Sequence, residues 1–425
     1  MSGSTGTSPF EDAVGAAHVT EAAPTDAIDG VMPRWVVETA TAAEVAVVMK
    51  IAHDHGLSVV ARGLGRHLTL GNAPRTVDVV LSLSRMNRVL SYEPADMTVQ
   101  VEAGCSLLAL GVVLFESSQW LPLDPPFVPQ TTVGGLLATN LTGPLRASQG
   151  SARDLLIGIR TVAPDGTIVA GGGRVVKNVA GYDLPKMHIG ALGTLGIIVE
   201  ATFKVRPRPH EERALEITCK DPAEAATMAL EMRDACEPFW LHLGNQGDAA
   251  WTIVAGAGGR SEEVTAALAS YRRIAEARGA TMRDVSNAAE TRHHLADSSA
   301  EADRNVLRIS TLPTRVGARL VSLEAAATRL GAAPAFHCDI ACGIIRMSID
   351  AAAHLADLVA EARPTIERDG GCLVVERANA ADKQTLSEIG GVWGDAGSGL
   401  PLMRGLKEAF DPTALLSPGR FVGGI

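Results

Sequence analysis

The sequence predicts an α+β protein in which a glycine-rich domain of two parts precedes a second α+β domain and a loop-rich C-terminal segment. Three observations predict this order. Residues 33–209 mix strand-like and helical patterns with glycine-rich turns. After Pro209 these turns give way to helices rich in Ala, Glu and Arg. A chain of 425 residues usually forms two or three domains. We therefore expect a loose tail over 1–32, domains over 33–209 and 210–385, and a C-terminal segment over 386–425.

The first domain opens with a helix and a strand whose limits are marked in the sequence. Thr41 followed by Glu44 forms a capping box, and Gly56 ends the helix. Residues 58–62 then read as a buried strand that enters a glycine-rich turn. Further along the chain we expect a strand over 77–83, a helix over 106–118, a hairpin over 157–169, a strand over 196–205, and helices over 261–278 and 351–363.

The composition excludes several classes of function. The chain has 38 basic and 48 acidic residues, a net charge of -10, and no block of Lys and Arg, which argues against nucleic-acid binding. Six scattered cysteines favour structural thiols over a disulfide scaffold, a metal site or an iron–sulfur cluster. No basic segment followed by an apolar one opens the chain, and no uncharged apolar run has spanning length. We expect a soluble, cytoplasmic protein without a metal ion.

The first motif runs from Arg62 to Gly71, with the sequence RGLGRHLTLG, directly after a predicted strand. A diphosphate carries two negative charges, and successive backbone N–H groups can hold it only where side chains do not block the approach. Gly63, Gly65 and Gly71 supply that access. No helix clearly follows, so the motif is not the Rossmann fingerprint. Taken alone, it is also compatible with an ordinary glycine-rich surface turn.

The second motif is more specific and spans residues 122–143, PLDPPFVPQTTVGGLLATNLTG. A proline-stiffened loop leads into Gly134-Gly135 and the small Ala138, which allows a large flat ligand to approach closely. Two further glycine-rich pieces follow at 177–184, KNVAGYDL, and at 190–198, GALGTLGII.

The two motifs, in this order and separation, resemble the FAD-binding domain of the p-cresol methylhydroxylase (PCMH) / vanillyl-alcohol oxidase superfamily. TTVGGLLATN, KNVAGYDL and GALGTLGIIVEATF resemble its branch of glycolate oxidases and D-lactate dehydrogenases. The ending FDPTALLSPGRF, with VGGI after it and Val392-Trp393-Gly394 before it, resembles the FAD-binding subunits of bacterial glycolate oxidases. The resemblance implies an α+β fold with a two-subdomain PCMH-type FAD-binding domain, an α+β cap domain, and a C-terminal segment that returns to the FAD domain.

The same resemblance implies which residues hold FAD. The loop from Arg62 to Gly71, which includes Leu64, Arg66 and His67, would hold the diphosphate. The residues that would line the flavin or its ribityl chain are Pro125, Thr132, Gly134, Gly135, Ala138 and Asn140, and those at the adenine side are Gly193, Gly196 and Ile198. Arg66 stands where relatives often have Ser or Thr, so it is a candidate to pair with a phosphate oxygen. His67 is out of register with the Arg-x-Gly-Gly-His pattern of covalent attachment, and we expect non-covalent FAD.

The resemblance further implies an FAD-dependent oxidoreductase that acts on a small 2-hydroxy acid. It would work beside a second FAD-binding subunit and pass electrons to an iron–sulfur subunit, and the partners would be able to hold it at the inner face of the membrane. Catalytic relatives carry a metal-associated His-Gly-Asp-Gly-Asn-type motif in the cap, which this sequence lacks. The alternatives are a mainly structural flavin-holding subunit and a standalone FAD-linked oxidoreductase, and the missing motif argues against the standalone enzyme.

Three residues of the second domain are candidates for catalysis. Arg346 and Arg308 are suited to hold a substrate carboxylate, and His337 to take the hydroxyl proton. Asp339 belongs to the same polar cluster. The alternative is an ordinary strand with solvated polar residues. Tyr182 and Asp183 are expected to order a loop beside the flavin rather than to act in catalysis.

Overall fold

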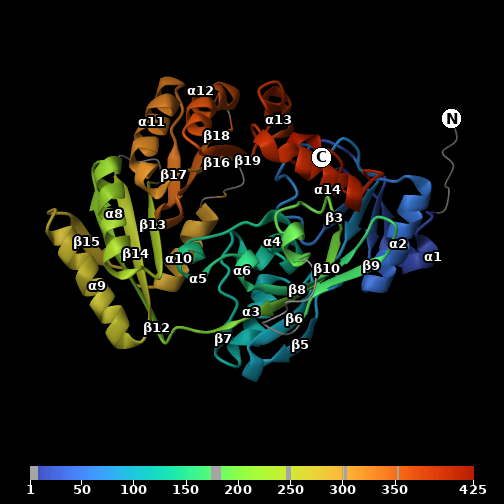
Figure 1. The fold of residues 1–425 in the computed structure, drawn as a ribbon, viewed down its shortest axis with the longest axis horizontal. Helices are drawn as coiled ribbons and strands as arrows, with labels where there is room; N and C mark the ends of the chain where they lie inside the picture. The colour runs from blue at the N-terminus through green and yellow to red at the C-terminus, as the bar shows by residue number, and fades with distance from the viewer. Residues whose placement is uncertain (1–7, 174–182, 246–249, 299, 301–303, 352–353) are drawn as a thin grey trace.

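A computed structural model describes residues 8–173, 183–245, 250–298, 300, 304–351 and 354–425 of the chain. Figure 1 shows two lobes, with residues up to about 209 in one and the strands β12 to β19 in the other. We call the second lobe the cap domain. The α+β class predicted from the sequence is confirmed, with a four-stranded, a five-stranded and a two-stranded sheet in the first lobe and an eight-stranded sheet in the cap.

The first sheet belongs to the N-terminal subdomain and has the strand order β1-β2-β4-β3. Its strands are β1 (Val19–Glu21), β2 (Trp35–Glu38), β3 (Val59–Arg62) and β4 (Val79–Ser82). The last three are parallel, and α2 (Ala42–His55) connects β2 to β3 as a crossover. As predicted, Thr41 caps α2 by accepting from the Glu44 N–H at 3.1 Å, and Gly56 ends it with a φ of 65°.

Residues 8–32 differ from the expected loose tail. They form α1 (Glu11–Val14) and β1, which pairs antiparallel with β2. Phe10 is fully buried and packs edge-on against Trp35 at 5.7 Å, and Ile28 is buried as well. The sequence analysis did not recognise Phe10 and Ile28 as buried residues, because small polar residues surround them. A few large apolar side chains are enough to hold such a segment against the domain.

The second subdomain is an antiparallel sheet with the order β5-β6-β10-β8-β9. Its strands are β5 (Val89–Glu93), β6 (Thr98–Glu102), β8 (Leu156–Val162), β9 (Ile168–Gly172) and β10 (Ile197–Lys204). The predicted hairpin at Asp165-Gly166 joins β8 to β9, with Gly166 at a φ of 86°. The remaining elements of this region are α3 (Leu107–Phe115), β7 (Gln119–Trp120), α4 (Val133–Thr139), α5 (Arg146–Gln149), α6 (Ala152–Leu155), α7 (Pro185–His188) and β11 (Arg206–Pro207).

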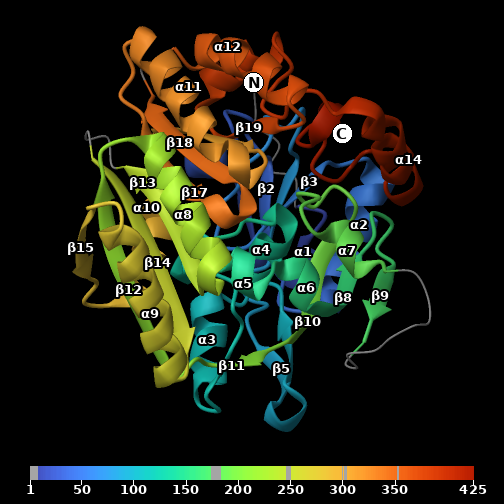
Figure 2. The ribbon, with the colours of Figure 1, turned by 60° about the vertical axis from the view of Figure 1, so that its left-hand side comes forward.

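The cap domain is built on an eight-stranded sheet with the order β15-β12-β14-β13-β17-β18-β16-β19. The strands are β12 (Glu211–Cys219), β13 (Trp240–Asn245), β14 (Trp251–Gly259), β15 (Thr281–Asp284), β16 (Arg304–Ser310), β17 (Ala335–Asp339), β18 (Ile344–Asp350) and β19 (Cys372–Arg377). Figure 2 shows helices lying over one face of this sheet, namely α8 (Pro222–Cys236), α9 (Ser261–Glu276), α11 (Val316–Arg329) and α12 (Leu355–Arg368).

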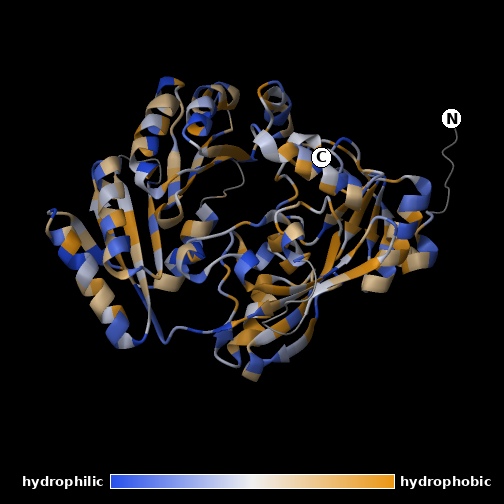
Figure 3. Ribbon diagram, in the orientation of Figure 1, coloured by the Kyte–Doolittle hydropathy of each residue, from blue (hydrophilic) through white to orange (hydrophobic). Residues whose placement is uncertain are grey.

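The helix-covered face of the cap sheet is apolar. Leu307, Phe336, Ile345 and Val375 belong to one buried core with residues of these helices. Figure 3 shows the apolar strands enclosed by helices whose outer surfaces are hydrophilic. Because successive side chains on a strand alternate between faces, the residues next to these in sequence point toward the first lobe. A further helix, α10 (Ala288–Ser298), lies on that side.

The C-terminal segment packs on the first lobe. It begins at the end of α13 (Ala380–Ser387) and contains α14 (Leu400–Phe410). Beyond α14 the chain runs along the edge of the first sheet, where Val59 N donates to Leu415 O at 2.8 Å and Ser417 N donates to Val59 O at 2.9 Å. Lys407 of α14 donates to the carbonyls of Thr194 and Leu416, which ties the segment to the second subdomain.

Candidate functional site

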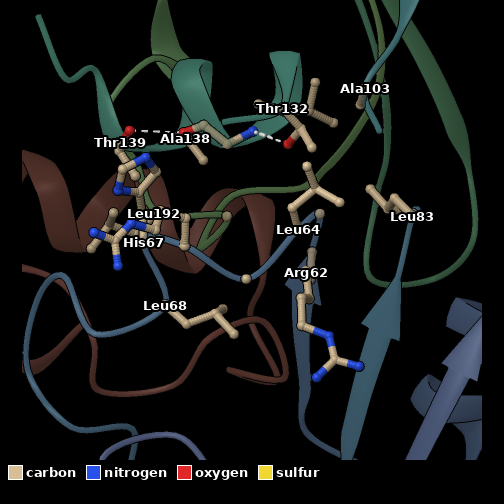
Figure 4. Close-up of a pocket in the computed structure, with 18 of the residues that line it drawn as sticks. Arg62, Leu64, His67, Leu68, Leu83, Ala103, Thr132, Ala138, Thr139 and Leu192 are labelled. Carbon is tan, nitrogen blue, oxygen red and sulfur yellow. Dashed lines mark hydrogen bonds between the residues drawn. The ribbon is translucent and has the colours of Figure 1, made fainter. Parts of the chain in front are cut away.

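A cavity of about 740 Å³, part of it open to solvent, lies where the two subdomains of the first lobe meet. Its walls are the loop that follows β3, the start of α4 and the segment before β10. Figure 4 shows Leu64 of the loop directed toward Thr132, the N-cap residue of α4. The size and the mostly apolar lining suit a large organic ligand with a few polar groups.

Gly63 allows the loop to approach α4 closely. A Cβ atom at this position would lie 2.3 Å from Thr132 Oγ1 and 2.8 Å from Thr132 Cγ2. The Thr132 hydroxyl cannot move away freely, because it accepts from Gly135 N at 3.1 Å to cap the helix. Gly134 is similarly confined, since its Cβ would lie 3.0 Å from Ala103 Cβ.

The loop also offers backbone donors. Among the described residues, no acceptor is found for the N–H groups of residues 63 to 67, where the ladder between β3 and β4 ends. A run of free N–H groups beside a cavity can hold an anionic ligand group. The loop therefore meets the requirement that its sequence suggested for a diphosphate.

The polar side chains of this loop contact other parts of the protein, whereas the sequence led us to expect that Arg66 pairs with a phosphate oxygen. Arg62 Nη1 donates to Asp26 Oδ1 at 2.6 Å, and Figure 4 shows this guanidinium turned away from α4. The Arg66 guanidinium is stacked 3.6 Å from the centre of the Phe127 ring. His67 Nε2 lies 2.9 Å from Thr131 Oγ1. Burial, together with the charge of Arg66, lowers the pKa of His67 to about 4, so it is a neutral loop histidine.

Thirteen of the sixteen expected FAD residues line the cavity. They are Arg62, Gly63, Leu64, Gly65, Arg66, His67, Thr132, Gly134, Gly135, Ala138, Gly193, Gly196 and Ile198. The other three, Gly71, Pro125 and Asn140, are not among its lining residues. A Cβ at Gly71 would lie 2.6 Å from Arg420 O, so this glycine admits the C-terminal segment rather than the ligand.

Thirteen of the expected residues, Ile198 included, thus line the cavity, and three do not. Asn140 ends α4 in the left-handed conformation, with a φ of 53° and with Oδ1 buried and unpartnered among the described residues. Pro125 lies in the loop next to Asp124, whose carboxylate is bound by Leu145 N and Arg292. Tyr182 lies outside the described residues, as does most of the piece 177–184, and Asp183 forms an ion pair with Lys186.

Several residues that line the cavity were not predicted from the sequence. Leu83, Ala103, Gln130, Thr139 and Leu192 also border the cavity, as does Arg420 from the far end of the chain. Gln130 and Thr139 lie within the second motif and Leu192 within the piece 190–198, whereas Leu83 and Ala103 lie outside the motifs, and nothing in these residue types marks them. Arg420 belongs to the SPGR piece of the C-terminal resemblance, and this was the signal that it lies near the cofactor.

Comparisons with known proteins agree with this site. Residues 33–172 match the family of the FAD binding domain. The first lobe therefore resembles known FAD-binding domains over most of its length. The structure of p-cresol methylhydroxylase with substrate bound shares the fold, with a TM-score of 0.76 at 16% identity over 97% of this chain and 95% of that one.

Two curated relatives are subunits of glycolate oxidases. The chain is 33% identical to GlcE of Escherichia coli over 42% of its own length and 52% of the relative. It is 32% identical to GlcD of Bacillus subtilis over 43% of its own length and 39% of the relative. The chain therefore spans about half or less of the relatives that it matches.

The residues of the cavity fit FAD, which is the cofactor of this domain. Gly63 leaves a space that a Cβ atom would fill. The N–H groups of residues 63 to 67, which have no acceptor among the described residues, suit a diphosphate. The apolar residues Leu64, Leu83 and Ile198 suit the flat rings.

The three catalytic candidates lie in one row on the open face of the cap sheet. Arg308 of β16 stands directly opposite Arg346 of β18, and Arg346 stands directly opposite His337 of β17. Directly opposed residues on antiparallel strands share a face. Arg346 and His337 are buried. The structure thus brings together residues that are far apart in the sequence.

Glu376 of β19, which the sequence analysis missed, binds both arginines. Its Oε1 accepts from Arg308 Nε and its Oε2 from Arg346 Nε, each at 2.9 Å. Burial raises the pKa of Glu376, but the charges of Arg346 and Arg308 outweigh burial and lower it overall. Glu376 also lines a second cavity of about 400 Å³ together with Arg66 and His67 of the FAD loop. It therefore links the row of candidates to the FAD-binding lobe.

Near His337, several buried polar atoms have no hydrogen-bond partner among the described residues. His337 Nδ1, both ring nitrogens of His242, and Asp339 Oδ2 are buried and have no hydrogen-bond partner among the described residues. The two imidazole rings lie 5.4 Å apart. Burial, with the charge of Arg346, lowers the pKa of His337 to about 4, and burial raises that of Asp339 to about 6. At neutral pH the two histidines are uncharged.

Two further properties bear on function. In the part of the chain that the structure describes, no three His, Cys, Asp or Glu side chains are grouped as metal ligands would be. No helix among the described residues is both long enough and apolar enough to cross a bilayer.

Proposed function

We propose that this protein is an FAD-dependent oxidoreductase that acts on the CH–OH group of a small 2-hydroxy acid. We further propose that it works as one subunit of a glycolate oxidase-like complex, beside a second FAD-binding subunit and an iron–sulfur subunit. The GlcE and GlcD relatives support the substrate class and the complex. The observation that carries the proposal is the row of Arg308, Arg346 and His337 on the cap face that points toward the FAD loop, with Arg346 and His337 buried.

The charges of the row suit one carboxylate. Arg308 and Arg346 carry one positive charge each, and Glu376 carries one negative charge. The three side chains together have a net charge of +1, which a substrate carboxylate would neutralise. Both arginines use Nε for Glu376, and among the described residues the Arg346 Nη atoms form no hydrogen bond. A planar guanidinium with free Nη atoms binds carboxylates well.

The proton of the substrate hydroxyl needs an acceptor. FAD, when bound, supplies the ring system that takes up the hydride. His337 is neutral, and its Nδ1 has no partner among the described residues, so it can accept a proton. A pKa of about 4 makes it a weak base, however, because an effective general base has a pKa near the working pH. This weakness supports a role within a complex over a standalone enzyme.

Anaerobic reduction of the bound flavin tests the proposal. The purified chain, alone and co-expressed with a candidate second flavoprotein and iron–sulfur protein, is mixed with glycolate or D-lactate, and the visible flavin band is followed. We expect slow or no bleaching of the isolated chain and rapid bleaching of the complex. Rapid bleaching of the isolated chain that is lost in a His337→Ala variant would favour the standalone enzyme. A complex that turns over normally with Arg346→Met and His337→Ala in this chain would favour the structural role.

A further inference from the structure

Arg420 is a buried cation in the wall of the FAD cavity. Its side chain comes from the last six residues of the chain and is only 4% exposed. It lines the cavity beside Leu68 and Leu192. The backbone on both sides is fixed, since Arg420 N donates to Ser417 O and its carbonyl accepts from Asn72 N at 3.0 Å and from Trp393 Nε1 at 3.1 Å.

The Arg420 guanidinium holds the far end of the glycine-rich loop. Its Nη2 donates to Leu68 O at 2.5 Å and to Leu70 O at 2.9 Å. These acceptors are carbonyl oxygens, which satisfy N–H groups but carry no full negative charge. The hydrogen bonds therefore position the cation without neutralising it.

No carboxylate neutralises Arg420 among the described residues. Arg62, another arginine of the cavity, is paired with Asp26, but Arg420 forms no ion pair. Asp29, the acidic residue whose charge acts on Arg420, is already bound by Lys383 Nζ at 2.7 Å. Arg420 Nε is buried and has no hydrogen-bond partner in the part of the chain that the structure describes. Burial lowers the pKa of Arg420 to about 10, so it stays charged at neutral pH.

A buried charge without a counter-ion is costly, and folded proteins keep one where a ligand supplies the opposite charge. We propose that Arg420 is the counter-cation of bound FAD and that it binds an anionic part of the cofactor while fixing the loop at Leu68 and Leu70. This part is either the diphosphate or the negative charge that the flavin gains on reduction. The inference concerns cofactor binding and does not rest on the hydroxy-acid activity.

Two substitutions separate charge from shape. Arg420→Met keeps the length of the side chain and removes the charge, and Arg420→Lys keeps the charge and can retain a bond to a loop carbonyl. Arg404→Met is the matched control, because Arg404 is an exposed arginine of α14. Each apoprotein is titrated calorimetrically with FAD and with ADP, which carries the diphosphate without the flavin. The midpoint potential of each FAD-loaded variant and the Tm of each apoprotein are also measured.

If Arg420 binds the diphosphate, Arg420→Met weakens the binding of both FAD and ADP by about 100-fold, and Arg420→Lys recovers most of the loss. If Arg420 instead stabilises the negative charge of the reduced flavin, Arg420→Met leaves the affinity for ADP unchanged and makes the midpoint potential of the bound FAD more negative. Arg404→Met changes none of these values. Unchanged affinities and potential in Arg420→Met would overturn the proposal. So would equal losses of Tm and FAD affinity in the Met and Lys variants, since these indicate a purely structural tie.

Discussion

His337 on β17 and Arg346 on β18 stand directly opposite each other, on the face of the cap sheet that turns away from its helices. Their neighbours in sequence, Phe336 and Ile345, lie in the helix-covered core. Because side chains alternate along each strand, Phe336 and Ile345 point into the packed core. His337 and Arg346 point to the other face, toward the FAD loop. The arrangement explains why polar side chains are buried here: they line the interface between the lobes rather than the core of one.

The first prediction concerns Glu376, which holds Arg346 and Arg308 together. Glu376→Gln removes the negative charge between two cations, and we expect it to lower the free energy of unfolding of the cap by about 3 kcal/mol. Arg308→Met should cost less, because Arg308 is the more exposed arginine and Glu376 keeps Arg346. Urea denaturation measures both. Glu408→Gln, an exposed change on α14, is the control, and equal stabilities of Glu376→Gln and the control would contradict the prediction.

A second prediction is that the purified chain is yellow and releases its FAD on denaturation. His67 is the only histidine of the FAD loop, and its Nε2 is engaged with Thr131 Oγ1. We expect acid precipitation to leave the flavin in the supernatant, where its absorption spectrum identifies it. Flavin that stays with the precipitated polypeptide would show covalent attachment instead. A colourless protein that cannot be loaded with FAD would contradict the cofactor assignment itself.

The third prediction compares two glycines of the cavity. Gly63→Ala places a methyl group against Thr132 and should open the loop, with at least a tenfold loss of FAD affinity, which corresponds to about 1.4 kcal/mol. Gly135→Ala meets only the Thr132 hydroxyl at 3.1 Å and should bind FAD nearly normally. Gly135→Glu adds a longer, charged side chain to the cavity wall and should lose FAD while the chain still folds.

Gly111→Ala is the control for these changes, because a Cβ there meets nothing within 4 Å. FAD affinity is measured by quenching of flavin fluorescence, and folding by circular dichroism. Normal FAD binding by Gly135→Glu would mean that this part of α4 does not face the cofactor.

The sequence predicted the parts of the site that are continuous in the chain. Residues 62–67 and 132–138 are local motifs, and their glycines carry a physical meaning that does not depend on the rest of the fold. Glu376 and Arg420 reach the site from other domains or segments, through pairings that no local pattern encodes. His337, Arg346 and Arg308 were each chosen by residue type, but their common row depends on the register of three strands, which the sequence alone does not give.

The same distinction applies to the fold. The helix α2 was predicted because its capping box and terminal glycine are local signals. The order of the eight cap strands depends on contacts between distant segments, such as β13 with β17, and could not be read from periodicity. Residues 8–32 were read as a loose tail because two buried anchors, Phe10 and Ile28, are too few to form a pattern.

The last prediction concerns the pH dependence of stability and Asp339. Its Oδ1 accepts from Cys342 N at 3.3 Å, its Oδ2 has no partner among the described residues, and burial raises its pKa from 3.8 to about 6. The folded protein therefore binds this proton more tightly than the unfolded chain does. Stability from this group is greatest below pH 3.8, falls between pH 3.8 and about 6, and is constant above that.

Asp339→Asn keeps an oxygen that can accept from Cys342 N and removes the titration. Relative to the unsubstituted protein, the variant should gain up to about 3 kcal/mol of stability between pH 4 and pH 7, because one pKa unit corresponds to about 1.4 kcal/mol. Urea denaturation of both proteins at pH 4, 5, 6 and 7 measures the difference. Asp96→Asn, an exposed change in the first lobe, should show no such trend. A difference between Asp339→Asn and the unsubstituted protein that does not change with pH would show that Asp339 has the same pKa folded and unfolded, and that a partner compensates for its burial.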